Sequence, residues 1–114
     1  MAVRRFDLLQ GTLDLLILKS LEADANHGYG IATRIHQLSD EVLRIEEGSL
    51  YPALYRLEEQ GLVTSEWRTT ENNRNAKFYK LTRKGRTAAG AELEGWTRLS
   101  RAITKVLRAM EQGA

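Results

Sequence analysis

The sequence predicts an α+β fold that is mainly α-helical and contains one small β-hairpin. Apolar residues recur at intervals of three and four in three short N-terminal segments, which is the spacing of one helix face. The pattern then changes to two short extended runs on either side of a polar, asparagine-rich loop at residues 69–75. A last, longer segment returns to steps of three and four, as expected for a long helix.

Length and composition fit one globular unit. The chain has 114 residues, of which 42% are hydrophobic and 28% charged, a balance that argues against disorder. No apolar run approaches the ~20 residues that span a bilayer, and residues 1–7 lack the apolar core of a secretion signal. The chain has no cysteine, which excludes disulfides and thiolate metal sites, so we expect a cytoplasmic protein with no membrane partner.

Two short helices are expected first. Thr12 is a good N-cap for a helix that runs to Leu21, and Asp14 in its first turn would suit the helix dipole. Turn-favouring residues at 23–28 separate it from a second helix that ends near residues 39–40. The apolar residues expected on the buried faces of the two helices are Leu13, Leu16, Ile17, Leu21, Ile31, Ile35 and Leu38.

A third helix is expected after a short extended segment at residues 42–45. Ser49 is placed to cap this helix, and Pro52 fits only in its first turn because proline lacks the N–H that later turns require. Gly61 suits the left-handed residue that follows a helix end. The buried face is expected to consist of Leu50, Leu54 and Leu57.

The change of period predicts a β-hairpin. Strands are expected at residues 62–68 and 76–81, with Trp67 packed against the base of the hairpin. Three short helices followed by a hairpin is the element order of a winged helix-turn-helix domain. In that fold the third helix enters the DNA major groove, and the hairpin, or wing, lies along the backbone or minor groove. Residues 1–85 are therefore expected to form the DNA-binding domain.

Residues 86–114 are expected to form a C-terminal dimerisation helix. Thr82 caps a helix that reaches about Gln112, and the glycines in its first half weaken it by up to ~1 kcal/mol each. An apolar seam at heptad spacing runs along it, and three short helices and a hairpin leave no surface that covers so long a seam in a monomer. We therefore expect a homodimer whose interface contains Trp96, Leu99, Ile103, Val106 and Met110.

Charge is distributed unevenly along the chain. Residues 68–86 hold seven lysines or arginines against one acid, although the whole chain has a net charge of only +2. Such a segment favours a polyanionic partner, and its place on the predicted wing favours double-stranded DNA. The alternative is a winged-helix protein-interaction module that has lost DNA binding, but such an adaptor has no need for seven cations on and beside its wing.

Three sequence motifs follow one another in a specific order. They are His27-Gly28-Tyr29-Gly30-Ile31, the Gly-Ser-Leu-Tyr-Pro run within residues 47–63, and the Lys-Phe-Tyr-Lys-Leu-Thr run within residues 77–85. Together they resemble the PadR family of bacterial transcriptional regulators, in its branch with a short C-terminal helix. The family's usual residue after His-Gly-Tyr is acidic, whereas here it is Gly30. The resemblance implies a homodimeric repressor on a palindromic operator, released by a small molecule in some members.

Candidate DNA contacts lie on the third helix, at the start of the second helix and on the wing. Tyr51 and Tyr55 are four residues apart, so they share a face, where they either reach phosphates and thymine methyl groups or pack at the domain surface. Arg56 either contacts DNA or pairs with Glu59 or Gln60. The full set of candidates is Tyr29, Ser49, Tyr51, Pro52, Tyr55, Arg56, Arg74 and Lys77.

Four of the candidate residues carry particular expectations. Ser49 either caps the third helix or binds a phosphate, because helix N-termini attract anions. Arg74 and Lys77 have no acidic neighbour in the sequence except Glu71, which favours phosphate or minor-groove contact. Trp96 is either dimer core alone or, as the resemblance implies, also a stacking surface for a small aromatic effector.

The sequence contains no recognisable catalytic or metal-binding constellation. It lacks a phosphate-binding glycine loop, a nucleophile elbow and a pair of catalytic carboxylates. His27 and His36 are nine residues apart with no cysteine, so a metal site would need distant carboxylates. His27 is instead expected to bond to backbone in the turn before the second helix. We therefore expect no enzyme activity, no cofactor and no bound metal.

Overall fold

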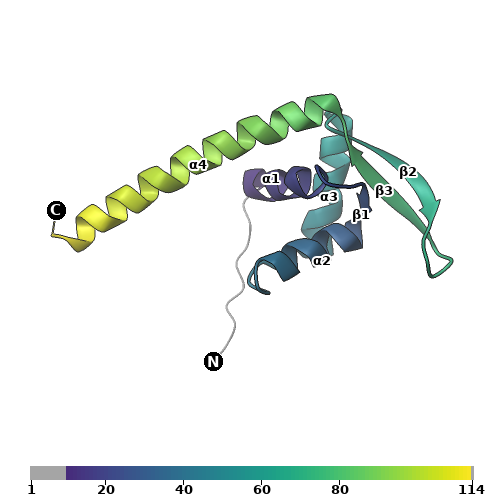
Figure 1. Ribbon diagram of the computed structural model, residues 1–114, viewed down its shortest axis with the longest axis horizontal. Helices are drawn as coiled ribbons and strands as arrows, with labels where there is room; N and C mark the ends of the chain where they lie inside the picture. The colour runs from purple at the N-terminus through teal and green to yellow at the C-terminus, as the bar shows by residue number, and fades with distance from the viewer. Residues whose placement is uncertain (1–9, 114) are drawn as a thin grey trace.

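Three short helices, a small sheet and a long terminal helix make up residues 10–113, the part of the chain that the computed structural model describes (Figure 1). The predicted α+β winged-helix order is confirmed, and α4 projects from the other elements as a long arm. The expectation for residues 1–7 lies outside the described residues. The elements are α1 (Gln10–Ser20), β1 (Asn26–His27), α2 (Gly28–Leu38), α3 (Glu47–Glu59), β2 (Val63–Thr69), β3 (Asn75–Leu81) and α4 (Arg83–Glu111).

The core lies between α1, α2, α3 and the inner end of the sheet. α1 buries Leu13, Leu15, Ile17 and Leu18 on more than one side, because α2 and α3 cover part of it and α4 covers another part. α1 begins at Gln10, so Thr12 lies inside the helix rather than at its cap, and Asp14 lies beyond the first turn. The largest side chains that are less than 2% exposed are Ile17, Leu18, Ile31, Leu50, Leu54, Leu57 and Val63.

The end of α2 differs from the predicted stripe. Ile31 and Ile35 are buried, but Leu38 is 73% exposed because α2 ends there. The chain turns at Asp40 and Glu41, which have φ values of +53° and +68°. The following segment forms neither helix nor strand, and its apolar side chains, Leu43 and Ile45, pack against the core instead of Leu38.

The start of α3 also differs from expectation, whereas its end is as predicted. Glu46 precedes the first turn, and its carbonyl accepts from the amides of Ser49 and Leu50 at 3.0 and 2.9 Å. Ser49 is therefore not the cap, and Pro52 stands in the second turn, where its ring nitrogen cannot donate to the carbonyl one turn earlier. Gly61 has a φ of +75° and follows the helix end, as its sequence position indicates.

The sheet contains a strand that the sequence does not predict. β1 pairs with β3 in an antiparallel ladder, which gives the order β1-β3-β2. β2 and β3 form the predicted hairpin, in which Val63 lies opposite Leu81 and Trp67 opposite Lys77. The hairpin extends beyond the helices at its tip, so Trp67 is 69% exposed and not packed at the base of the wing.

The junction between the wing and α4 is as predicted at Thr82. The Thr82 hydroxyl accepts from the Gly85 amide at 2.9 Å and caps α4. Gly85 is required here for a reason that the sequence does not show, because a Cβ at this position would overlap the carbonyl oxygen of Leu62. None of the described helices is both long and apolar enough to cross a membrane.

Candidate nucleic-acid interface

α3 has one buried face and one exposed face. Leu50, Ala53, Leu54 and Leu57 are buried as a continuous stripe. The opposite side exposes four of the predicted candidates, which we call the α3 face. Its residues are Ser49, Tyr51, Pro52 and Tyr55.

Two aromatic side chains connect the α3 face to the start of α2. Tyr51 is 44% exposed, and its ring lies so close to Gly28 that a Cβ there would stand 2.9 Å from Tyr51 Cε1. Tyr29 is 72% exposed, and its ring stacks with that of His27 at 6.4 Å between centroids. His27 caps α2 as expected, because its Nδ1 accepts from the Gly30 amide at 3.0 Å.

Tyr55 is the most exposed aromatic residue of α3, at 66%. Its hydroxyl donates a hydrogen bond to the carboxylate of Glu59, one turn later, and this bond with the nearby negative charge raises the pKa of the phenol above its ordinary value of 10.0. The phenol is therefore neutral at physiological pH and carries one donor proton. A partner that approaches this face meets an aromatic ring with a polar tip, a side chain suited to mixed apolar and polar contacts.

Arg56 turns away from the α3 face. Its Nη2 lies 2.6 Å from Oδ1 of Asp14 on α1, and the two side chains are only 30% and 16% exposed. Asp14 is thus the partner of Arg56 in place of the predicted Glu59 or Gln60, and the ion pair joins α1 to α3. Burial raises the pKa of Asp14 above 3.8, although the hydrogen bond and the charge of Arg56 offset part of this effect. This geometry gives Arg56 a structural role.

The wing presents its two candidate cations differently. Lys77 Nζ lies 3.6 Å from Glu58 on α3 and 5.9 Å from the centroid of the Tyr79 ring, so it has an acidic neighbour after all. Arg74 lies in the exposed turn at the wing tip, and its side chain makes no ion pair or hydrogen bond with any residue of the described range 10–113. Of the two, Arg74 is the cation that is free for an external anion.

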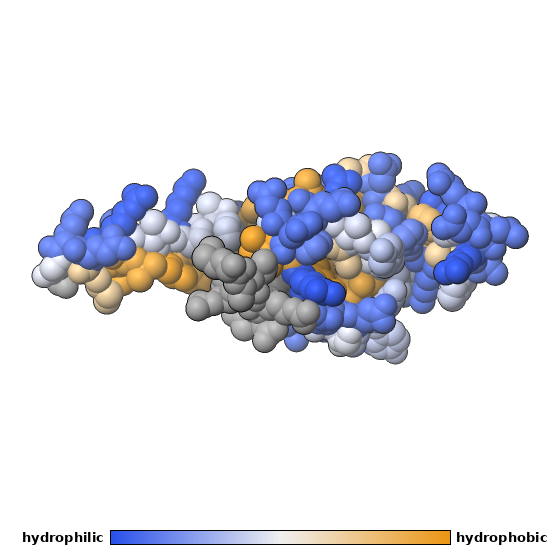
Figure 2. All heavy atoms as spheres, turned by 90° about the horizontal axis from the view of Figure 1, so that it is seen from below, coloured by the Kyte–Doolittle hydropathy of each residue, from blue (hydrophilic) through white to orange (hydrophobic). Residues whose placement is uncertain are grey.

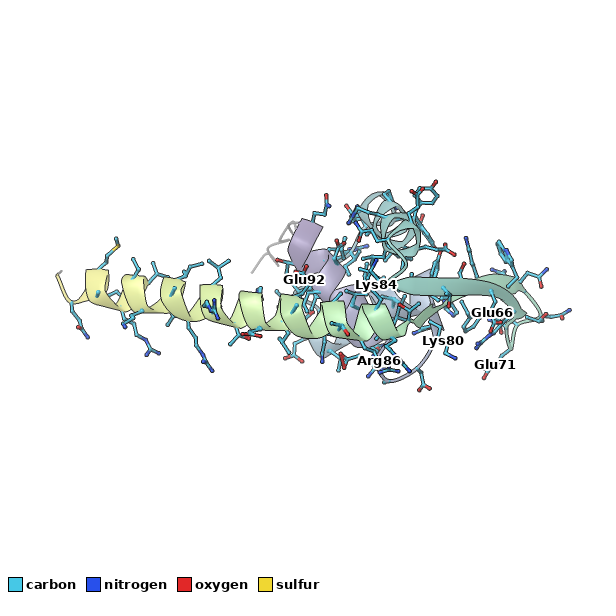
Figure 3. All side chains as sticks on the ribbon, turned by 90° about the horizontal axis from the view of Figure 1, so that it is seen from above. Glu66, Glu71, Lys80, Lys84, Arg86 and Glu92 are labelled. Carbon is cyan, nitrogen blue, oxygen red and sulfur yellow. The ribbon has the colours of Figure 1, made fainter. Side chains whose placement is uncertain are left out.

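The basic segment 68–86 does not form one surface. Lys84 Nζ donates to the carbonyl of Gln60 at 2.9 Å, on the side of α4 nearest α3, whereas Arg86 lies on the other side (Figure 3). Lys80 lies opposite Thr64 in the β2–β3 register, on the sheet face that points away from α3. Arg68 is held by Glu66 at 2.5 Å on that same face. Charge counting along the sequence therefore overstates the cations available near α3.

The apolar seam of α4 is uncovered in the single chain. Its five residues are between 48% and 64% exposed, and Figure 2 shows hydrophobic side chains along the underside of the projecting arm. Leu107, which the heptad count missed, is 55% exposed and adds to the apolar surface of the arm. A groove of about 390 Å³ lies between the start of α1 and α4, and Leu15, Trp96 and Leu99 are among its lining residues.

The described residues provide no evidence for a metal centre. No group of three or more His, Cys, Asp or Glu side chains lies together within residues 10–113. The arrangement instead consists of an exposed recognition-type helix, a wing beside it and an uncovered arm. These three parts match what proteins that read DNA as dimers require.

Comparison with known proteins gives consistent matches. The chain matches the Transcriptional regulator PadR-like family over residues 17–91. A solved transcriptional regulator from Clostridium thermocellum is 30% identical with a TM-score of 0.77, over 84% of this chain and 90% of that chain. A PadR family regulator from Eggerthella lenta is 33% identical with a TM-score of 0.71, over 86% and 83%. The transcriptional regulator Rv3488 of Mycobacterium tuberculosis is 36% identical over 67 residues, 59% of this chain and 62% of that protein.

Proposed function

Because the chain belongs to the PadR-like family of transcriptional regulators, we propose that it is a homodimeric repressor that binds a palindromic operator. Members of this family regulate transcription and are not enzymes. The observation that best supports the proposal is the exposed α3 face beside a projecting wing with a free cation at its tip. In this proposal the residues up to 85 bind DNA and residues 86–114 form the dimer.

The α3 face supplies the sequence-reading contacts in this proposal. The hydroxyl of Ser49 is exposed near the N-terminus of α3, where helix amides and the helix dipole favour a phosphate. Tyr51, Pro52 and Tyr55 present apolar surface and two hydroxyls to the major groove, where thymine methyl groups and base-edge acceptors are read. Tyr29 adds a phosphate contact from the start of α2. Arg56 is left out because Asp14 holds it.

The apolar seam supplies the dimer contacts. Its side chains are about half exposed in one chain, so covering each contributes about 1 kcal/mol, half of the usual value for a whole side chain. Five residues in each of two copies then contribute about 10 kcal/mol, which is within the range of the estimated cost of association. An isologous interface would place the two α3 helices about 34 Å apart, in successive major grooves.

Trp96 is also the proposed contact for a small aromatic effector. Its indole is 48% exposed, and it lines the groove between α1 and α4 together with apolar side chains. A planar ligand stacked there would lie next to the seam, where its binding can shift the two α3 helices relative to each other. That coupling would release the operator.

Salt dependence of operator binding tests the interface. The operator is first selected from random DNA, and its affinity is then measured by fluorescence anisotropy at several salt concentrations. Arg74→Ala should weaken operator and random DNA alike and should reduce the slope of log affinity against log salt by about 2, for two phosphate contacts per dimer. Arg101→Ala is the matched control, because Arg101 is an exposed arginine on the arm of α4.

The α3 face is tested in the same assay. Tyr51→Ala and Tyr55→Ala should reduce operator affinity more than affinity for random DNA, because base contacts carry specificity.

Equal salt slopes for wild type, Arg74→Ala and Arg101→Ala would remove the wing tip from the interface. Failure of the wild-type protein to select any DNA sequence would overturn the proposed function itself.

A further inference from the structure

Trp67 is an exposed aromatic residue that no side chain of residues 10–113 buries. Its indole is 69% exposed, more than any residue of the apolar seam. It stands on β2, two residues before this strand ends at Thr69 near the tip of the wing. A single exposed apolar residue is ordinary by itself, so the inference depends on which groups surround Trp67 and which face of the wing it occupies.

The strand register shows which way Trp67 points. Side chains alternate along a strand, so Val63, Ser65 and Trp67 lie on one face of β2. Val63 is buried, and the Ser65 hydroxyl donates to a carboxylate oxygen of Glu58 on α3 at 2.5 Å. That face is therefore the one turned toward α3. Trp67 continues the same face two residues farther toward the wing tip, opposite Lys77.

The neighbour of Trp67 across the hairpin carries a positive charge. Trp67 lies directly opposite Lys77, whose Nζ is 3.6 Å from Glu58. The free cation of Arg74 follows at the tip. An exposed indole beside a lysine, on a wing with a free arginine at its tip, is a combination suited to a polyanion with apolar walls, which describes the sugar-phosphate backbone of DNA.

The opposite face of the wing is satisfied within the chain. Arg68 pairs with Glu66 at 2.5 Å and lies over the ring of Phe78 at 5.0 Å. Phe78 in turn makes an edge contact with His27 at 5.1 Å between ring centroids. Phe78, the aromatic residue on the outer face, is thus packed, whereas Trp67 on the α3 side is 69% exposed. This asymmetry places the missing partner on the α3 side.

We propose that Trp67 is a minor-groove contact that makes the protein prefer A·T pairs beside the bases read by α3. The indole packs against the sugar walls of the groove, and its Nε1–H donates to adenine N3 or thymine O2. The guanine amino group blocks this approach, so a G·C pair is disfavoured. Arg74, the free cation at the wing tip, binds a phosphate of the groove wall. This inference rests on the proposed function, because it needs α3 in the neighbouring major groove.

A mutant cycle that combines protein substitutions with base-pair substitutions tests the preference for A·T pairs. The selected operator is compared with a version in which the A·T pairs flanking each half-site are replaced by G·C pairs. The wild-type protein should lose about 100-fold in affinity, about tenfold for the poor base pair at each of the two half-sites. Trp67→Ala should bind both DNAs equally. Thr64→Ala, an exposed position on the outer face of the same strand, is the matched control and should keep the wild-type preference.

Fluorescence tests the contact without altering Trp67. The chain has two tryptophans, so Trp96→Phe leaves Trp67 as the only indole and Trp67→Phe leaves only Trp96. Operator titration should change the emission of the first protein more than that of the second, while anisotropy of labelled DNA reports binding by each. Unchanged Trp67 emission on bound operator, or a flank preference that survives in Trp67→Ala, would overturn the proposal. Both results leave the proposed function intact, which fails only if wild type selects no operator.

Discussion

Replacing Ile103 with aspartate tests the dimer, without which a palindrome cannot be read. Ile103 is 50% exposed in the single chain and lies in the middle of the apolar seam. In a dimer the substitution removes about 1 kcal/mol of apolar burial per copy. It also places an unpaired carboxylate in an apolar interface, and the two-fold axis does so twice, at several kcal/mol each. The association free energy should therefore fall by at least about 4 kcal/mol, which raises the dissociation constant at least 1,000-fold.

Sedimentation velocity at micromolar concentration is the appropriate measurement. Wild type should sediment as a dimer and Ile103→Asp as a monomer whose circular dichroism shows that the winged-helix domain remains folded. Thr104→Asp is the matched control, because it introduces the same charge at the next position of α4, on the surface that Thr104 shares with Arg101 and Lys105. This control should remain dimeric. If Ile103→Asp is still a dimer at micromolar concentration, the seam is not the interface and this reasoning is refuted.

Two further predictions concern stability. In thermal denaturation, Gly85→Ala should destabilise the fold by about 2 kcal/mol or more, because its Cβ would overlap the Leu62 carbonyl. Gly90→Ala, with nothing within 4 Å of the new Cβ, should instead stabilise α4 by about 0.5–1 kcal/mol. Equal effects of the two substitutions would contradict this account of Gly85. Burial raises the pKa of Asp14 above 3.8 despite Arg56, so its contribution to the unfolding free energy is largest below pH 3.8 and is lost as pH rises through the folded-state pKa. Asp14→Asn should remove that component from the pH profile of stability, and an unchanged profile would show that Asp14 does not cause it.

Local signals in the sequence predict most of the helices and the hairpin. The spacing of Leu50, Leu54 and Leu57 identifies the buried face of α3, and Gly61 marks its end. Thr82 identifies the start of α4 in the same way. These features depend on residues a few positions apart, so they are visible in one sequence.

Other features depend on partners that are distant in the sequence. Arg56 pairs with Asp14 across 42 positions, so the predicted pairing with its near neighbours Glu59 or Gln60 is wrong. β1 has two residues and no period of its own, and it exists only because β3 offers a free edge. Trp67 is 69% exposed although Val63 and Ser65 on the same strand face contact the core and α3, a difference that no local pattern reveals.

The site residues divide along the same line. Tyr51 and Tyr55 share an exposed face because a helix repeats every 3.6 residues, and the sequence predicts this. The pairing of Lys77 with Glu58 requires the packing of the wing on α3, and it leaves Arg74 as the free cation of the two wing candidates. DNA contact by these residues and dimerisation through the seam remain predictions.

Selection of bound sequences from random double-stranded DNA by the full-length protein tests the central claim most directly. If the chain reads DNA as a two-fold dimer through α3 and the wing, the enriched sequences should contain an inverted repeat with half-site centres about 10 base pairs apart or a multiple of that spacing. The flanks of each half-site should be rich in A·T pairs. Enrichment of no sequence, or of a single site without two-fold symmetry, would contradict the account.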